Sequence, residues 1–342
     1  MPDGPVDWRT LRDAAAHSLA EGRLDEAETR YLGARQAAEA AGASDEEMSD
    51  LLLDLLDVLV SQDKHDEATQ VGEEWLAALE RFNDPNHPMI GMALKLLAST
   101  AAARGDAARA RTLFRRSRAI LEAALGRMSP EVADCLMDNA ALHVDQGHAD
   151  DAVPLYRRAL AIRETELGPD TPDVAEALLA LGRCYRALDD YNDARRYLRR
   201  ALATTEHVFG TGSTDAAEAA QALAELYMDD DDFEEATPLL NRALIVLEEH
   251  LGPNSPEVAY CLQNLSAAYS GRNQHEPAFF HFRRAVAIYE TDQGQDDPDL
   301  PKLYEHFAEL AEAAGRPDEA PAARARAEEL RRKPPADGNP AG

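Results

Sequence analysis

The stretch LGPDTPDVA, Leu167–Ala175, decides the fold because the chain repeats it at a fixed interval. It returns as LGPNSPEVA at Leu251–Ala259 and as LGRMSPEVA at Leu125–Ala133, and weaker copies are FGTGSTDAA from Phe209 and QGQDDPDL from Gln293. The glycines of these copies lie 42 residues apart, at Gly126, Gly168, Gly210, Gly252 and Gly294, and two periods earlier lies Gly42. A period of this length is typical of stacked repeats, each of which is one supersecondary unit.

Each copy carries the residues that end one helix and begin the next. Glycine closes a helix in the left-handed conformation without a Cβ clash. A hydroxyl residue then caps the next helix, and proline occupies its first position, where no N–H is needed. An acidic residue follows and faces the positive end of the helix dipole. The predicted caps are Ser129, Thr171 and Ser255, and the prolines are Pro130, Pro172, Pro256 and Pro298.

Two helical patterns lie between successive copies. In the fifth unit the apolar positions from Val174 to Leu188 follow the i, i+3, i+4 spacing of an amphipathic helix, and a second helix is expected from about Asp193 to Val208. Strand patterns are absent, so the sequence predicts an all-α fold. First helices are expected to begin near Val6, Asp45, Pro88, Pro130, Pro172, Thr214, Pro256 and Pro298.

One alanine recurs at a fixed position of the second helices. A small residue at a fixed helical position indicates that another backbone passes close by, so we expect the two helices of a pair to touch there. The series is Ala68, Ala110, Ala152, Ala194, Ala236, Ala278 and Ala320, and Ala27 falls one residue off the period.

These patterns resemble the tetratricopeptide repeat. The best copies place Leu178, Leu181, Gly182 and Tyr185 before Ala194, Leu198 and Ala201. The 42-residue period and the LGPxxPxVA linker resemble the long repeats of kinesin light chains and their bacterial relatives. His143 stands where a tyrosine is usual, and the heptad coiled coil of kinesin light chains is missing. The resemblance implies a right-handed α-solenoid of about eight stacked helix-turn-helix repeats.

The expected organisation is one solenoid domain over residues 7–332, with an N-terminal extension, 1–6, and a disordered tail, 333–342, rich in proline and glycine. The approximate repeats are 7–42, 45–84, 88–126, 130–168, 172–210, 214–252, 256–294 and 298–332.

The formal net charge of −29 argues against nucleic acid and anionic membranes as partners, because both require a basic surface. No apolar run approaches the ~18 residues of a membrane span, and no signal peptide is visible, so we expect a cytoplasmic protein. Abundant alanine, with arginine in place of lysine, suggests a GC-rich bacterial genome. The acidity has two interpretations: a solvated, mutually repelling surface, or a face for a basic partner.

Catalytic and cofactor motifs such as HExxH, GxSxG and GxGxxG are absent from the sequence, so we expect neither an enzyme nor a bound cofactor or metal. Cys135, Cys184 and Cys261 are interpreted as buried thiols. His143 and His148 lie five residues apart across a helix end, which is a poor spacing for a shared ligand set. The run Asp229–Asp232 lacks the glycine and distal glutamate of a calcium loop and is interpreted as a solvated turn.

By resemblance to peptide-binding tetratricopeptide domains, a partner would lie on the concave surface lined by the first helices. This groove is mostly acidic, with Arg183 and Arg186 as an island, and therefore predicts a basic or amphipathic protein or peptide partner. The alternative is that its charges only solvate a helix face. The implied groove residues are Asp134, Asp138, Asp145, Glu176, Leu179, Arg183, Arg186, Glu218, Gln221, Glu225, Asp229, Tyr260, Gln263 and Asn264, with Asp50, Asp54 and Asp57 on the matching face upstream.

The main hypothesis is a non-enzymatic adaptor that holds an extended peptide in this acidic groove. The alternative is a structural or assembly subunit that self-associates or docks through convex or terminal surfaces, suggested by the apolar residues Leu51–Leu53, Leu55 and Leu56. A third hypothesis is a peptide-sensing regulator. The sequence indicates neither the partner nor the oligomeric state.

Overall fold

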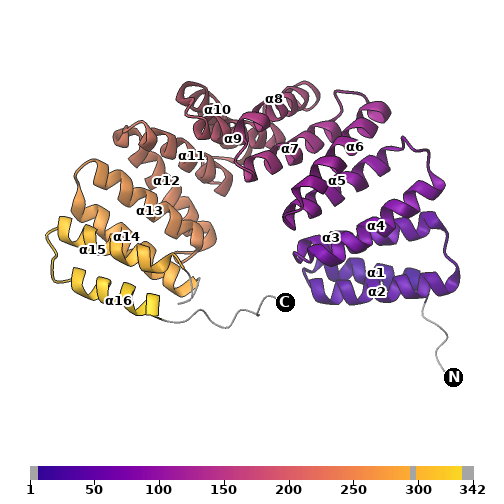
Figure 1. Cartoon of the computed structure of the whole chain (residues 1–342), viewed down its shortest axis with the longest axis horizontal. Helices are drawn as coiled ribbons and strands as arrows, with labels where there is room; N and C mark the ends of the chain where they lie inside the picture. Colours follow the sequence, from indigo (N-terminus) through magenta and orange to yellow (C-terminus); the bar gives the residue numbers. More distant parts are fainter. Residues whose placement is uncertain (1–6, 293–297, 333–342) are drawn as a thin grey trace. The chain divides into compact units, whose positions relative to one another are not determined.

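The computed structural model describes residues 7–292 and 298–332, and these residues form sixteen α-helices and no strand (Figure 1). The predicted all-α fold of paired helices is confirmed. The helices are α1 (Trp8–Ala20), α2 (Leu24–Ala41), α3 (Asp45–Ser61), α4 (His65–Phe82), α5 (Pro88–Ala103), α6 (Ala107–Leu125), α7 (Pro130–Asp145), α8 (Ala149–Glu166), α9 (Pro172–Ala187), α10 (Tyr191–Phe209), α11 (Thr214–Asp229), α12 (Phe233–Leu251), α13 (Pro256–Gly271), α14 (His275–Asp292), α15 (Leu300–Ala313) and α16 (Ala320–Arg332).

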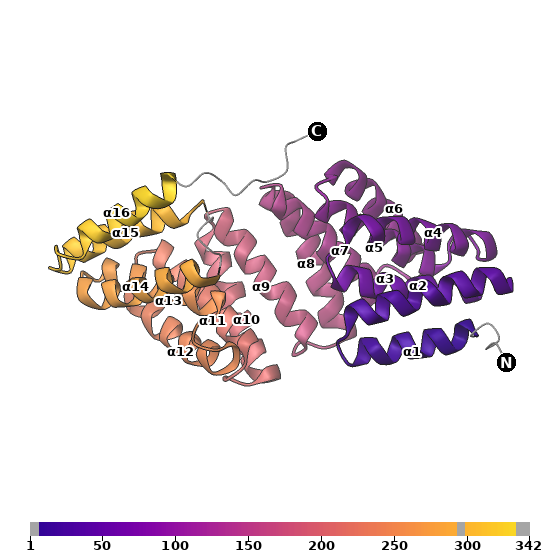
Figure 2. The ribbon, with the colours of Figure 1, turned by 90° about the horizontal axis from the view of Figure 1, so that it is seen from below.

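The chain divides into two compact units, residues 1–168 and 169–342, which we call the N-terminal and C-terminal units. In both units each odd-numbered helix packs against the helix that follows it, so every repeat is a helical hairpin (Figures 1 and 2). Neighbouring hairpins pack through the second helix of one and the first helix of the next, as α4 on α5 and α12 on α13. One continuous domain over residues 7–332 stays a prediction.

The helix starts follow the local chemistry of the linkers. Six first helices begin at the predicted residue, from Asp45 to Pro256. The three predicted hydroxyl caps each accept a hydrogen bond from the backbone N–H three residues later, at 3.4, 3.4 and 3.3 Å. Their positions are Ser129, Thr171 and Ser255.

Two predicted helix starts are wrong by two residues. α10 begins at Tyr191 rather than Asp193, and α15 begins at Leu300 rather than Pro298. The second shift has a clear cause: a helix from Pro298 would place Pro301 where the first backbone hydrogen bond forms, whereas a start at Leu300 leaves it in the first turn, where no N–H is needed. Val6, Gly294, the extension 1–6 and the tail 333–342 lie outside the described residues.

The linker glycines adopt two conformations, and one of them is rarer than the sequence predicted. Gly42 takes the expected left-handed form, with φ 69° and ψ 41°. Gly210, at the end of α10, has φ 89° and ψ 158° instead. That region is open essentially only to glycine, since any Cβ would clash with the backbone. The 42-residue period therefore marks positions where the backbone itself requires glycine.

The recurring alanines are buried, with relative exposures of 0–1%. At one of them the close approach of the paired helices is directly visible, because the Ser266 hydroxyl of α13 donates to the Ala278 carbonyl of α14 at 2.8 Å. In the fifth repeat, a Cβ on Gly182 of α9 would lie 3.2 Å from the backbone nitrogen of Leu198 in α10. The predicted contact between the helices of a pair is confirmed.

The apolar residues near the N-terminus do not form a surface. Leu51, Leu52, Leu55 and Leu56 are only 0–3% exposed and belong to the core of the N-terminal unit. These leucines, which suggested self-assembly, therefore pack in the core, because a helix that lies between two other helices must be apolar on more than one side.

The three cysteines are free and buried, as predicted. Burial raises the pKa of the Cys184 thiol to about 11 and that of the Cys261 thiol to about 12. These thiols are therefore protonated at neutral pH and pack as small apolar side chains.

The second helices are joined by pairs of charges that the sequence interpretation did not anticipate. An arginine in one second helix pairs with a glutamate 36 residues earlier, in the preceding second helix. We call this set the Arg–Glu ladder: Arg116–Glu80, Arg158–Glu122, Arg242–Glu206, Arg284–Glu248 and Arg326–Glu290. Its successive arginines, like its successive glutamates, lie 42 or 84 residues apart, so the signal is present in the sequence.

We expect Gly210→Ala to lower the free energy of unfolding by about 1–3 kcal/mol, because the side chain forces strain at a positive φ. Urea denaturation followed by circular dichroism measures the change. Gly212→Ala is the matched control in the same linker, since a Cβ meets no atom within 4 Å at either glycine and only Gly210 has a positive φ. Equal destabilisation by both substitutions would contradict the conformational argument.

Ala194→Leu should also destabilise the protein, by about 1–3 kcal/mol, because the larger side chain overpacks the contact between α9 and α10. Ala203→Leu places the same side chain on an exposed position of α10 and should change stability by less than ~0.5 kcal/mol. Thermal unfolding of the two variants compares them directly, and a difference of zero would show that the alanine is not a close contact.

Candidate functional site

Within each unit, neighbouring first helices contact one another through ion pairs, and each pair includes at least one residue that the sequence assigned to the groove. Arg12 of α1 lies 2.6 Å from Asp54 of α3. In the C-terminal unit, Arg183 of α9 lies 2.9 Å from Glu218 of α11. The first helices thus present one shared face, which we call the inner face.

The inner face of the N-terminal unit contains Asp134, Asp138 and Asp145 of α7. Asp138 accepts a hydrogen bond from the Ser99 hydroxyl at 3.3 Å, and the Lys95 ammonium lies 3.8 Å away. Asp145 is exposed. A shallow cavity of about 280 Å³ brings Asp138 and Asp145 together beside Phe114 and Leu142.

Asp134 has a structural role that the sequence interpretation missed. The side chain of Arg163 in α8 is only 5% exposed, and its Nη2 donates to Asp134 Oδ1 at 3.1 Å. A buried guanidinium needs charged or polar partners to offset its desolvation. Asp134 therefore stabilises the fourth hairpin.

The C-terminal unit concentrates its inner-face contacts on Glu225 of α11. One Glu225 carboxylate oxygen accepts from the Tyr260 hydroxyl at 2.7 Å and from the Asn264 amide at 3.3 Å. The other pairs with Arg186, which also binds Asp229. Burial and the contact with Glu225 raise the pKa of Tyr260. Three first helices, α9, α11 and α13, are thereby connected through one carboxylate.

The remaining predicted residues surround this network. Gln221 is buried, Leu179 is half-buried and Glu176 is exposed. Gln263 accepts a hydrogen bond from the Tyr289 hydroxyl at 3.3 Å. Arg183 and Arg186 are each paired with carboxylates of α11. These two arginines therefore neutralise part of the negative charge of the inner face.

A cavity of about 360 Å³ opens on this face between α9, α11 and α13. Five of its lining residues are predicted groove residues, and two, Pro256 and Glu257, were not predicted. Pro256 and Glu257 are the first two residues of α13, and the sequence interpretation assigned them only to helix capping. The lining consists of Arg183, Glu218, Gln221, Glu225, Pro256, Glu257 and Tyr260.

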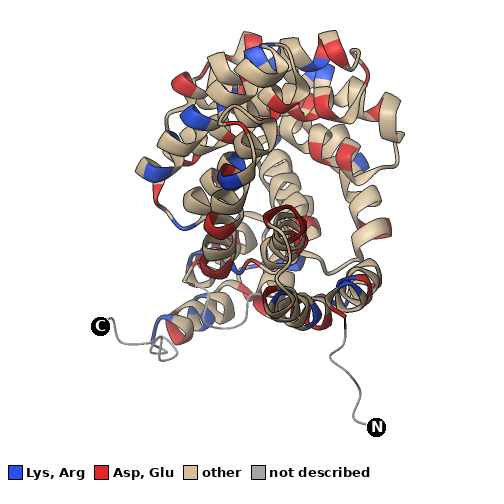
Figure 3. Cartoon of the chain, turned by 90° about the vertical axis from the view of Figure 1, so that its right-hand side faces the viewer, with Lys and Arg blue, Asp and Glu red and all other residues tan. Residues whose placement is uncertain are grey.

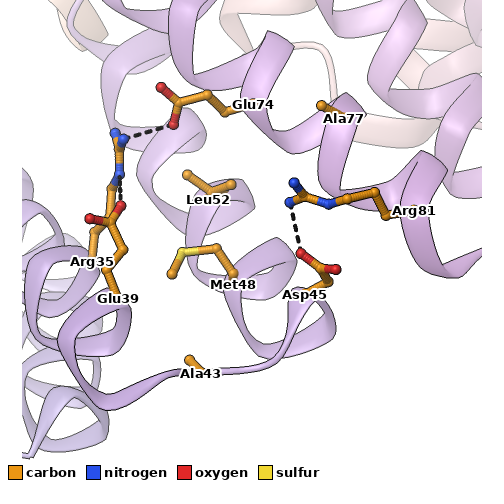
Figure 4. A pocket seen from close by; sticks show the side chains of 9 residues that line it. All are labelled: Arg35, Glu39, Ala43, Asp45, Met48, Leu52, Glu74, Ala77 and Arg81. Carbon is orange, nitrogen blue, oxygen red and sulfur yellow. Dashed lines mark hydrogen bonds and ion pairs between the residues drawn. The ribbon is translucent and has the colours of Figure 1, made fainter.

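A third cavity, of about 390 Å³, lies among α2, α3 and α4 (Figure 4). Met48 and Leu52 lie between two ion pairs, Arg35–Glu74 at 2.8 Å and Arg81–Asp45 at 2.7 Å. The sequence interpretation did not assign these residues to a site. Arg35 and Arg81 are both paired with carboxylates, so their charges are neutralised. The cavity therefore offers an apolar patch between two ion pairs.

Charged residues of both signs are interspersed over the helices (Figure 3). Over residues 7–292 and 298–332, no helix combines the length and the apolar character needed to cross a membrane.

Comparison with protein families matches the tetratricopeptide repeat at residues 57–123, 131–207 and 215–291, which together exceed half of the chain. The chain belongs to the tetratricopeptide repeat family. Its all-α architecture is that of a helical repeat solenoid, a fold of protein-interaction scaffolds.

Solved structures show the same repeats. BtubC (BKLC) from P. vanneervenii is 25% identical, with a TM-score of 0.54 over 72% of this chain and 95% of that one. A Podosopora anserina protein described as a kinesin light chain with nearly identical TPR-like repeats is 20% identical, with a TM-score of 0.53 over 59% of this chain and 96% of the other. The resemblance to kinesin-light-chain-like repeats is confirmed.

The quorum sensor NprR from B. thuringiensis, in its apo form, has a TM-score of 0.69 at 12% identity, over 95% of this chain and 87% of that one. Such a low identity shows the fold alone. No sequence among the curated proteins matches this tetratricopeptide repeat chain.

Asp134→Lys should lower the free energy of unfolding by about 1.5–3 kcal/mol, because it removes a charged hydrogen bond from the buried Arg163 and adds a like charge. Asp145→Lys is the matched charge reversal on the same helix, at an exposed position, and should change stability by less than ~0.5 kcal/mol. Chemical denaturation separates the two, and equal midpoints would show that Asp134 is not structural.

Proposed function

We propose that this tetratricopeptide repeat protein is a non-enzymatic scaffold that binds an extended segment of a partner protein across the inner face of its C-terminal unit. The observation that carries the proposal is the 360 Å³ cavity, which lies at the groove positions that the family resemblance implied. Three consecutive first helices line it, so an extended peptide crossing them would meet several repeats.

The chemistry of the cavity favours a basic side chain. The Tyr260 residue is 46% exposed, and Glu257 makes no ion pair within the described parts of the chain. A lysine or arginine of the partner can lie over the Tyr260 ring while its cationic end pairs with Glu257. Pro256 supplies an apolar wall, so a basic and amphipathic segment fits both properties.

The ion pair and hydrogen bonds around the cavity affect which partner segments bind. Glu225 is held in place by Arg186, Tyr260 and Asn264, so its charge is fixed in position before a partner arrives. Preorganised polar groups reduce the entropy lost on binding. Exposed charge pairs contribute ~0–1 kcal/mol each, and their main effects are on specificity and association rate.

Tetratricopeptide repeats are interaction modules, and the thiols of this chain are buried and protonated, which supports a non-enzymatic role. Free rather than paired cysteines support a reducing compartment, the cytoplasm. The alternative role in assembly has lost most of its support, since four of the five leucines that suggested it are buried and Leu53 is half-buried.

Selection of binders from a random peptide library displayed on phage, with the full chain as bait, tests the proposal. We expect the selected peptides to carry at least one lysine or arginine next to an apolar residue. Glu257→Lys and Tyr260→Ala should each weaken their affinity at least tenfold in fluorescence anisotropy, because each removes one of the two groups that face the cation.

Glu249→Lys is the matched control, since it makes the same charge reversal on an exposed position of α12 in the same unit. It should leave affinity within a factor of about two. The proposal would be overturned by a library that yields no binder, or by binders whose affinity is unchanged in both inner-face variants.

A further inference from the structure

The turn between α7 and α8 brings together three side chains able to bind a metal ion. His143 lies in the last turn of α7, His148 directly precedes α8, and Asp151 lies in the first turn of α8. One ligand atom of each lies within 4.8 Å of the other two, and His143 Nδ1 is 3.8 Å from Asp151 Oδ2. The sequence spacing had argued against a shared ligand set, but the turn brings the three ligand atoms close together.

The backbone fixes this proximity. The His148 N–H donates to the His143 carbonyl at 2.9 Å, and the Gly147 N–H donates to the Val144 carbonyl at 2.8 Å. Gly147 itself has φ 75°. This tight closure folds the chain back within five residues, so two histidines that look separated in sequence face the same small space.

His143 has an unmet requirement for a polar partner. Its side chain is 19% exposed, and its Nδ1 atom is buried and makes no hydrogen bond to any residue that the structure describes. Buried polar atoms in folded proteins are almost always paired. The equivalent position in the next three repeats is a tyrosine, at Tyr185, Tyr227 and Tyr269. A cation bound at Nδ1 would supply the missing partner.

His148 also replaces a residue with a clear structural role. In the third, fifth and sixth repeats the second helix is capped by the side chain of Asp106, Asp190 or Asp232. His148 occupies the same position but makes no side-chain capping bond. The fourth repeat therefore has imidazoles at two positions where its neighbours carry packing and capping residues.

We propose that His143, His148 and Asp151 bind a divalent transition-metal ion, and Zn²⁺ in particular. Imidazole nitrogen and carboxylate oxygen are ordinary zinc ligands, with bonds of about 2.0–2.2 Å. Tetrahedral geometry at these bond lengths places ligand atoms about 3.3–3.5 Å apart, so small side-chain rotations close the observed distances. Three protein ligands leave one position for water or for a group from another molecule.

Isothermal titration of ZnCl₂ into the tag-free full chain, stripped of metal beforehand, tests the site. We expect one zinc ion per chain and a higher thermal unfolding temperature with zinc, because a ligand that binds only the folded state stabilises it. His148→Ala, Asp151→Asn and His143→Tyr should each weaken binding at least tenfold. The last variant introduces the residue of the neighbouring repeats, which preserves the packing role of that position.

Two matched controls should keep the affinity of the unaltered chain: Asp150→Asn in the same helical turn, and His207→Ala at an exposed histidine of α10. The proposal is overturned if zinc shows no saturable binding below millimolar concentration, or if His148→Ala and Asp151→Asn bind it as the unaltered chain does. If His143→Tyr fails to fold, as judged by circular dichroism, the two exposed-residue variants decide the question.

Discussion

The close contact between the two helices of each hairpin is the constraint on which the rest of this structure depends. A buried alanine or glycine allows the backbones to approach, and the larger apolar residues around it then become available for stacking on neighbouring hairpins. No hairpin of this size buries enough surface to fold alone, so the repeats must be stacked to be stable. The recurring alanine thus determines both the hairpin and the way hairpins pack.

Charge in this protein serves the arrangement of repeats as much as its solubility. The Arg–Glu ladder joins second helices, while Arg12–Asp54 and Arg183–Glu218 join first helices. Exposed pairs of this kind contribute only ~0–1 kcal/mol each, so apolar burial remains the source of stability. Their effect is on register, because a guanidinium has a fixed donor geometry that suits a carboxylate better than an ammonium does. This role offers a physical reason for the preference for arginine over lysine.

Individual repeats differ at positions outside the recurring alanine and the Arg–Glu ladder. The seventh repeat places Tyr260 and Glu257 on the inner face, and the fourth places two histidines in its turn. Neither feature involves the recurring alanine or the Arg–Glu ladder. In a repeat protein, specific binding chemistry can therefore be added to one repeat without disturbing the fold, because each repeat contacts only its neighbours.

The sequence by itself determined the helical hairpins, most of their boundaries and the buried alanines. These features follow from local chemistry, such as a proline without an N–H, a hydroxyl cap or a small side chain, repeated often enough to be unambiguous. The groove positions could also be named, because the resemblance to peptide-binding tetratricopeptide domains implied them and helical periodicity places such residues on one face. The contacts that these residues make could not be predicted. The contact of Asp134 with Arg163, and those of Glu225 with Arg186 and Tyr260, depend on distances between different helices. The approach of His143 to Asp151 likewise depends on how tightly one turn closes. Only the tertiary structure decides such contacts, since sequence spacing fixes the direction of a side chain along its own helix but not what lies opposite.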